Sequence, residues 1–336
     1  MKKKHPLISI VVPVYNSRLY IQHTLDSLDA QTYKNFEIIF IDDGSTDRTI
    51  DLLIEYKNKR NNISIYQQVN SGVSAARNKG IELSNGDFVT FLDSDDSYSS
   101  NYLEKMILRL QETNSDIVYC GYNEYYFSEN KNKSKKISCL FLEGNVLKSY
   151  FQYNGYFHLS GILIRRKILL EKNISFEVGQ NISEDLLFTV KLLSQLDFYC
   201  VKEHLFYYSK RVGSVMFSNW NDNKWLTDII GRKKILTYLT KDYHKEDRSE
   251  VLDLASRYVF QRELSYLIDC IKKMKYEKIK CYIKNNDMLL IECSLHKYKL
   301  NKKDINKFRI IKKNNKLIWF LYTIYYRFFR LNIKIF

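Results

Sequence analysis

The chain has 336 residues, of which 45% are hydrophobic and 15% aromatic, so it can bury a sizeable core and is not a disordered protein. Its formal charge of +15 is unevenly spread: residues 1–100 hold 11 Lys and Arg against 13 Asp and Glu, and residues 271–336 hold 18 against 4. The basic end suits nucleic acid, an anionic lipid surface or water alone.

Short patterns indicate neither export nor membrane insertion. The apolar run Leu7–Val14 is too short for a signal peptide and leads into a turn without a small-residue cleavage site. No apolar stretch reaches the roughly 18 residues of a membrane-spanning helix. The six cysteines include no C-x-x-C pair, as in proteins of a reducing compartment. We therefore expect a cytoplasmic protein.

Four apolar runs in the first hundred residues predict strands. They cover residues 7–14, 36–41, 63–66 and 88–92, and Pro13 is expected to end the first of them. Helix signals separate these runs. Strands joined by helices of this length predict right-handed βαβ units, hence an α/β fold with ligands beyond the carboxyl ends of the strands.

The helix signals are capping residues followed by apolar residues at helical spacing. Ser17 is expected to cap a first helix and Asp47 a second, while Gly72 stands at the start of a third. The first helix is expected to bury a stripe made of Leu19, Ile21, Leu25 and Leu28.

An acidic stretch follows the fourth predicted strand. If that strand continues through it, Asp93 and Asp95 point to one face and Asp96 to the other. Carboxylates this close repel one another unless a cation lies among them, and Mg²⁺ and Mn²⁺ prefer such ligands and also take phosphate oxygens. The alternative is a solvated turn that closes the strand.

Two more clusters follow the other predicted strands. Pro13 and Tyr15 suit packing on a nucleobase, with Asp42 accepting a hydrogen bond from that base. The alternative is that Pro13 and Tyr15 simply belong to a turn and that Asp42 caps a helix. Gly72 and Arg77 suit a diphosphate, because free amide groups and a cation would meet there, or else form a cap with a surface arginine.

Together these motifs resemble the family 2 glycosyltransferases of GT-A fold, in order and in spacing. The motifs are Pro13-Val14-Tyr15-Asn16, Asp42-Asp43-Gly44-Ser45-Thr46-Asp47, Gly72 to Gly80 with Ala76-Arg77-Asn78, and Asp93-Ser94-Asp95-Asp96. The resemblance implies a Rossmann-like mixed sheet flanked by helices. It also implies inverting transfer from a nucleotide sugar, usually a UDP sugar, with Mn²⁺ or Mg²⁺ at the diphosphate.

The resemblance also implies roles for single residues. Pro13, Tyr15 and Asp42 would hold the nucleobase. Asp93 would lie at the ribose or the metal, and Asp95 would ligate the metal.

A second acidic pair opens a predicted helix in the middle of the chain. Glu184 and Asp185 lie in its first turn, where carboxylates also simply complement the helix dipole. The resemblance implies that Asp185 is the catalytic base. An ionised Asp185 would take the proton of the acceptor hydroxyl on the face opposite the leaving group, so that its task is positioning.

The segment Leu205–Met216 resembles the aromatic and basic segment of the family. Ser209 stands where many members carry Arg, so Lys210 or Arg211 is expected to meet the diphosphate instead, the alternative being a solvated basic turn. His158, a lone histidine among aromatic residues, is expected to be structural.

From about Trp220 the pattern is helical and basic. The last apolar segment, residues 317–330, follows Arg309, Lys312, Lys313 and Lys316. Such a helix suits the anionic inner face of the cytoplasmic membrane, with a lipid-linked acceptor; the alternative is a helix docked on the core with solvated lysines.

These patterns predict three regions: residues 1–105 binding the nucleotide sugar, residues 106–219 holding the acceptor and the base, and the helical residues 220–336. The expected function is sugar transfer to a glycan or lipid-linked oligosaccharide. A nucleic-acid-binding protein that uses the basic end is the alternative, and the acidic sheet edge argues against it.

Overall fold

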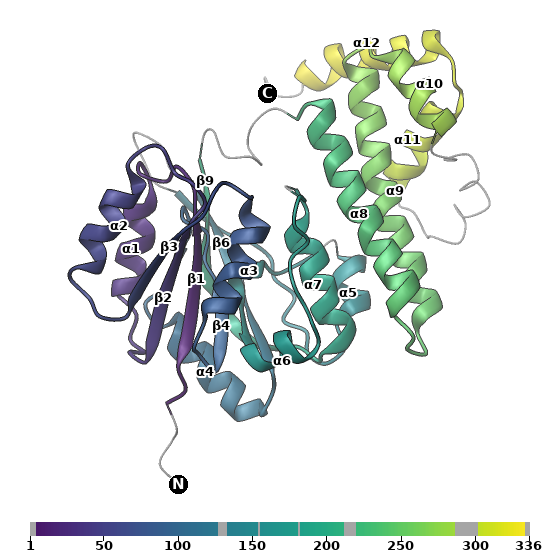
Figure 1. Cartoon of the computed structure of the whole chain (residues 1–336). Coiled ribbons are helices and arrows are strands. Elements are labelled where there is room, and N and C mark those ends of the chain that lie inside the picture. The colour runs from purple at the N-terminus through teal and green to yellow at the C-terminus, as the bar shows by residue number, and fades with distance from the viewer. Residues whose placement is uncertain are drawn as a thin grey trace. The chain divides into compact units, whose positions relative to one another are not determined.

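The structure is a computed structural model that describes residues 5–126, 133–153, 155–180, 182–211, 220–285 and 302–332. The chain divides into two compact units, Met1–Trp220 and Asn221–Phe336 (Figure 1). Each unit has its own hydrophobic core. The predicted subdivision of the first unit into residues 1–105 and 106–219 stays a prediction.

The first unit is built on one mixed sheet, which has nine strands among the described residues. Its order is β3-β2-β1-β4-β8-β6-β9-β5, and β7 pairs with β6. The strands are β1 (Ile8–Val14), β2 (Phe36–Asp42), β3 (Ile63–Gln67), β4 (Phe88–Phe91), β5 (Ser97–Tyr98), β6 (Ile117–Tyr126), β7 (Lys133–Lys136), β8 (Ile162–Arg165) and β9 (Tyr199–Lys210). The four strands β1 to β4 are parallel, and β8 pairs antiparallel with both β4 and β6.

Helices cover the sheet on both faces (Figure 1). The helices of this unit are α1 (Ile21–Asp29), α2 (Thr49–Lys57), α3 (Val73–Leu83), α4 (Tyr102–Thr113), α5 (Leu147–Gln152), α6 (Arg166–Glu171) and α7 (Glu184–Gln195), with a 3-10 turn at Leu159–Gly161. Alternate residues of a strand face opposite ways, so Ile10 and Val12 pack with α1, α2 and α4 while Val11 meets Gly80 of α3 on the other face.

Two details of the first βα unit differ from the prediction. The strand β1 does not end at Pro13 but pairs with β2 through Val14. Val11 accepts a hydrogen bond from Leu92, and Pro13 faces the same side beyond the end of β4, so its missing N–H costs no ladder bond.

The helix α1 starts at Ile21, and the side chain of Ser17 does not cap it. Instead the carbonyl of Ser17 accepts hydrogen bonds from the backbone of Tyr20 and Ile21. Leu19 therefore precedes the helix and is 92% exposed, although Ile21, Leu25 and Leu28 are buried as predicted.

The second unit is helical in its described part. Its helices are α8 (Asp222–Asp242), α9 (Arg248–Lys272), α10 (Tyr276–Asn285), α11 (Lys302–Lys312) and α12 (Lys316–Asn332). The core of this unit joins Leu264 and Ile271 of α9 to Phe308 of α11 and Trp319 of α12. In the described residues, no helix combines the length and the apolarity needed to cross a membrane.

Candidate active site

The loops that follow β1 and β2 lie side by side, because these two strands are parallel and Val14 at the end of β1 is opposite Asp42 at the end of β2. Tyr15 is 50% exposed, whereas Pro13 is buried. Asp42 is also fully buried, and its carboxylate accepts hydrogen bonds from the backbone of Ser45 (3.2 Å) and the side chain of Gln67 (3.1 Å). Of the three residues expected at the nucleobase, Tyr15 is therefore the accessible one.

The N-terminus of α3 is closed by Asp43, which the sequence analysis gave no role. Its carboxylate accepts hydrogen bonds from the backbone of Ser71 (2.8 Å) and Gly72 (2.9 Å) and from the side chain of Gln68 (2.8 Å). Gly72 has a φ of +87°, which a residue without Cβ adopts easily. The free amide group expected at Gly72 is thus occupied in this structure, because a carboxylate complements the positive end of the helix.

The acidic stretch lies on a turn and not on a strand, since β4 ends at Phe91. The backbone N–H of Asp96 donates to the carbonyl of Asp93 (3.0 Å) and closes the turn. The predicted alternation of strand faces therefore does not apply. Each carboxylate instead has its own partner: Arg77 for Asp93, Arg211 for Asp95, and the backbone of Ser209 for Asp96.

Arg77 connects the acidic turn to the start of α7. Its guanidinium donates to Asp93 (2.8 Å) and to Glu184 (3.0 Å) and lies over the ring of Phe176. The side chain is only 5% exposed. Burial acts to lower the pKa of Arg77, but the charges of Asp93 and Glu184 outweigh it and raise the pKa, so the guanidinium stays charged.

Asp185 lies next to this ion bridge, in the first turn of α7. Burial raises the pKa of the Asp185 carboxyl, and the charge of Arg77 opposes that rise. Its carboxylate accepts a hydrogen bond from the backbone of Leu186 (2.9 Å). A carboxylate with a raised pKa is a stronger base than an aspartate in water, so the structure adds basicity to the positioning expected from the sequence.

Arg211 reaches the acidic turn from the end of β9. Its Nε donates to Asp95 (2.8 Å), and its guanidinium lies 3.7 Å from the centroid of the Tyr20 ring. Ser209 donates its backbone N–H to Asp96 (2.7 Å). The structure thereby places Arg211 beside the predicted metal ligand Asp95.

His158 packs against the rings of Phe206 (4.9 Å between centroids) and Tyr208 (5.3 Å). Burial lowers the pKa of His158 to about 4, so the imidazole is neutral at physiological pH. Its Nδ1 accepts a hydrogen bond from the backbone of Ser160 (3.2 Å). The ring therefore fixes the loop before β8.

Asp93 and Asp95 of the acidic turn supply two carboxylates that suit a divalent cation, but these are too few to complete its coordination shell. Burial and the charge of Asp93 raise the pKa of Asp95, so a further positive charge between the two would relieve their repulsion. Among the described residues no group of three His, Cys, Asp or Glu side chains is arranged to hold a metal. The donor set fits a hard cation that completes its shell with diphosphate oxygens and water.

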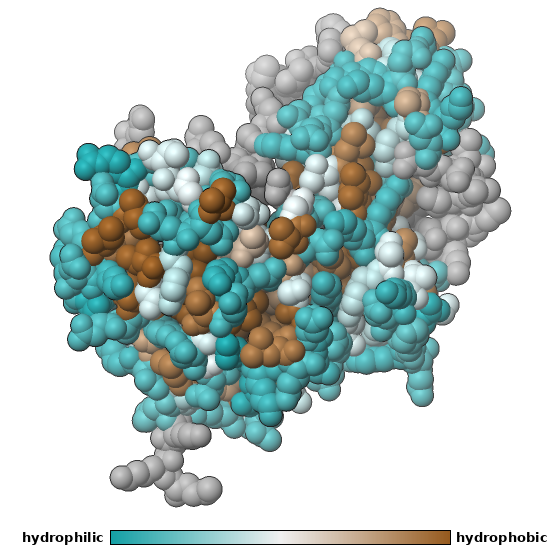
Figure 2. Space-filling view, viewed as in Figure 1, coloured by the Kyte–Doolittle hydropathy of each residue, from teal (hydrophilic) through white to brown (hydrophobic). Residues whose placement is uncertain are grey.

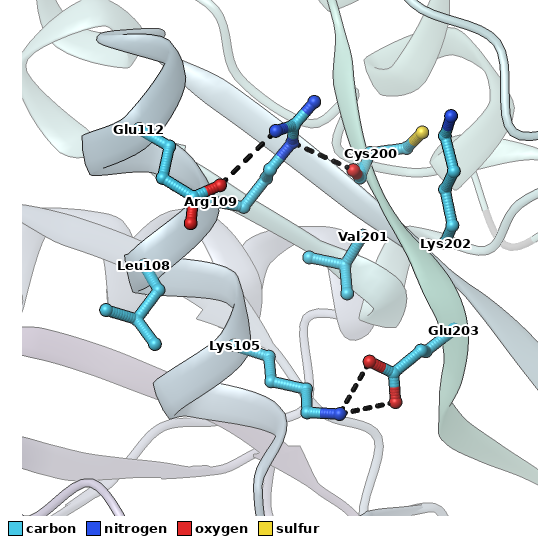
Figure 3. Close-up of a pocket in the computed structure, with 8 residues that line it drawn as sticks. All are labelled: Lys105, Leu108, Arg109, Glu112, Cys200, Val201, Lys202 and Glu203. Carbon is cyan, nitrogen blue, oxygen red and sulfur yellow. Dashed lines mark hydrogen bonds and ion pairs between the residues drawn. The ribbon is translucent and has the colours of Figure 1, made fainter.

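A groove of about 430 Å³ lies between α4 and β9 and shares no residue with the acidic turn (Figure 3). Four of its five charged side chains form ion pairs, Lys105 with Glu203 and Arg109 with Glu112, and Arg109 also donates to the carbonyl of Cys200 (Figure 3). This pairing leaves little net charge to attract a charged ligand. The groove has no part in the site described above.

The chain is similar to known proteins in sequence and in structure. The family Glycosyl transferase family 2 matches residues 9–173. The putative glycosyltransferase EpsH of Bacillus subtilis (strain 168) is 44% identical over 117 residues, which cover 35% of this chain and 34% of EpsH. The minor teichoic acid biosynthesis protein GgaA of the same strain is 31% identical over 254 residues, or 72% of this chain and 56% of GgaA.

Among solved structures, S. aureus TarS 1-349 in complex with UDP-GlcNAc matches with a TM-score of 0.64 and 21% identity, over 91% of this chain and 90% of that one. This likeness confirms the predicted α/β fold of GT-A type with its helical C-terminal part. In sequence, the chain spans about a third of EpsH and just over half of GgaA.

Proposed function

The chain belongs to glycosyl transferase family 2 through residues 9–173, and from this premise we propose that it transfers a sugar from a UDP sugar to a hydroxyl group of a glycan or lipid-linked oligosaccharide. The product would be part of a cell-surface polysaccharide. The name of GgaA supports this acceptor class, and the UDP-GlcNAc bound to TarS supports the donor class.

The observation that carries this proposal is the ion bridge of Arg77. It joins Asp93 and Glu184, which lie 16 and 107 residues away from it in sequence. The bridge thereby holds Asp93, which is proposed to bind the donor, in one cluster with Asp185, the neighbour of Glu184 that is proposed as the base. A sugar transferase needs the donor-binding carboxylates and the base on opposite sides of the same anomeric carbon.

Asp185 would act as the general base. Its carboxylate takes the proton of the acceptor hydroxyl as the acceptor oxygen bonds to the anomeric carbon, and the UDP leaves with the electrons of the broken bond. The partial burial of Asp185 raises its pKa, which favours this proton transfer. Arg77 and Glu184 would position the start of α7 and make no bond to the reacting atoms.

Asp95, with Asp93, would hold Mn²⁺ or Mg²⁺ together with the diphosphate of the donor. The bound cation would neutralise charge on the departing diphosphate. Tyr15 would pack on the nucleobase beside Pro13 and Asp42, and Arg211 would approach the diphosphate from the other side of Asp95. Gly72 would reach a diphosphate only if its N–H left Asp43.

The test is the release of UDP from a panel of UDP sugars, together with calorimetry of UDP in the presence of Mn²⁺. We expect Mn²⁺-dependent UDP binding that Asp95→Ala weakens at least tenfold. The control Asp51→Ala alters an exposed carboxylate on α2, paired there with Arg48, and should bind as the native chain does. Tight oligonucleotide binding without any UDP binding would instead support the nucleic-acid alternative.

A further inference from the structure

The helix α12 has two apolar faces, and its partners in the second unit cover one of them. Trp319 is fully buried and donates its ring N–H to the carbonyl of Ile310 (2.9 Å). Thr323, one turn later, is also buried and donates to the carbonyl of Ile271 on α9 (2.9 Å). The helix is therefore fixed to the core of this unit before any partner binds.

The opposite face of α12 is a stripe of exposed apolar side chains. It consists of Leu317 (64% exposed), Phe320 (40%), Leu321 (55%) and Ile324 (36%). Their spacing of three, four and seven residues places all four on one side of a helix, away from Trp319 and Thr323. Figure 2 shows hydrophobic atoms on the outer edge of this unit, where α12 runs in Figure 1.

The surroundings of this stripe are strongly basic. Residues 302–332 contain nine Lys and Arg and one Asp, and that aspartate is buried. Arg309 and Lys313 are exposed at the end of α11, and Lys316 is exposed at the start of α12. An apolar stripe with cations beside it complements a surface that is apolar below an anionic layer.

We propose that α12 lies flat on an anionic lipid bilayer, with the four stripe residues among the acyl chains and the flanking cations at the head groups. A second copy of this chain would bring the same positive charge and would be repelled. A nucleic acid would leave the apolar stripe without a partner. Because Trp319 already holds the helix in place, membrane binding carries no entropic cost of folding the helix.

Vesicle sedimentation tests this proposal on the whole chain, without any turnover, so its result does not depend on the proposed enzyme activity. Vesicles of phosphatidylcholine alone are compared with vesicles of equal parts phosphatidylcholine and phosphatidylglycerol. We expect the chain to sediment with the second kind only. The double variants Leu317→Gln/Leu321→Gln and Arg309→Gln/Lys313→Gln should each bind roughly tenfold or more weakly.

Matched controls lie on the first unit. Leu170→Gln changes a leucine of similar exposure (52%), and Lys57→Gln/Lys172→Gln removes two exposed lysines. Both controls should sediment as the native chain does. Circular dichroism of each variant checks that the helices are retained.

Two results would overturn the proposal. One is equal sedimentation of the native chain and the stripe variant with anionic vesicles. The other is no vesicle binding by the native chain together with a dimer that the stripe variant abolishes, which would assign the stripe to a second copy.

Discussion

At the scale of single residues, the candidate site depends on how buried charges are paired. Arg77 is almost completely buried and neutralises carboxylates from two distant segments. Removing Arg77 leaves the nearly buried Glu184 and the partly buried Asp93 without a counter-charge, which costs more than the ion bridge contributes when it is intact. Arg77 is therefore as much a structural residue as a candidate for donor binding.

The variant Arg77→Ala should lower the free energy of unfolding by about 3–5 kcal/mol, since Asp93 and Glu184 lose their partner. Denaturant unfolding followed by circular dichroism measures this change. The control Arg48→Ala removes an arginine whose side chain is 76% exposed and whose ion pair with Asp51 is solvated, and it should cost less than about 1 kcal/mol. Equal losses for the two variants would contradict the role given to Arg77.

Asp185 supplies a prediction on pH. Only the deprotonated carboxylate accepts a proton, so kcat should fall as the pH drops through the pKa of Asp185. Burial raises that pKa, so the fall should occur at higher pH than for an aspartate in water. Measuring kcat as a function of pH gives the pH at which this fall occurs.

The matched variant is Asp185→Asn, which keeps the shape of the side chain. It should lower kcat by about 10²–10⁴-fold and leave UDP binding within a few-fold of the native chain. If this variant keeps both its rate and the same acid limb, Asp185 is not the base.

At the scale of elements, α3 packs closely on the sheet at Gly80. A Cβ added to Gly80 would lie 2.9 Å from Cγ2 of Val11 and closer still to Cγ1. Gly72 lies at the start of the same helix, and Arg77 in its second turn reaches Asp93 of the acidic turn.

Gly80→Ala should therefore destabilise the protein by about 1–3 kcal/mol through overpacking, even though alanine is the better helix former by about 1 kcal/mol. Lys79→Ala, at the neighbouring position, removes a partly exposed lysine paired with Glu82 on the helix surface and should change stability by no more than about 0.5 kcal/mol. Thermal and denaturant unfolding of both variants compare them. A gain in stability for Gly80→Ala would show that the helix moves away from Val11 at no cost.

At the scale of the whole molecule, each unit has hydrophobic clusters of its own among the described residues. A cluster of the first unit joins the strands to α1, α2 and α4, and a cluster of the second unit joins the helices from α8 to α12. Every residue proposed to bind the donor or to act as base lies before Trp220, and the apolar stripe of α12 lies after it. Catalysis and surface binding are thus proposed for different units.

A chain that ends at Trp220 should unfold in one cooperative transition and should bind UDP about as well as the full chain, because its core includes no residue of the second unit. The same chain should not sediment with anionic vesicles. Denaturant unfolding, calorimetry and sedimentation measure these three properties. A non-cooperative transition would show that the first unit needs the second in order to fold.

Much of this organisation follows from local sequence. Apolar runs of strand length separated by helix signals predict β1 to β4, because burial on both faces leaves little room for polar residues. The carboxyl ends of parallel strands then meet at one edge, so the closeness of Tyr15, Asp42 and Asp93 also follows. The docking of α12 through Trp319 matches the predicted alternative of a helix packed on a core, whereas contact of its exposed stripe with a membrane stays a proposal.

What the sequence by itself determined is therefore the order of the first four strands and of the helices between them, and the sheet edge at which the proposed site residues follow those strands, since periodicity and turn residues act over a few positions. Only the tertiary structure decided which charges meet: Arg77 with Glu184, Arg211 with Asp95, and Asp43 with the start of α3. Ion pairs depend on distances between segments that the chain brings together from far apart, and no local pattern encodes those distances.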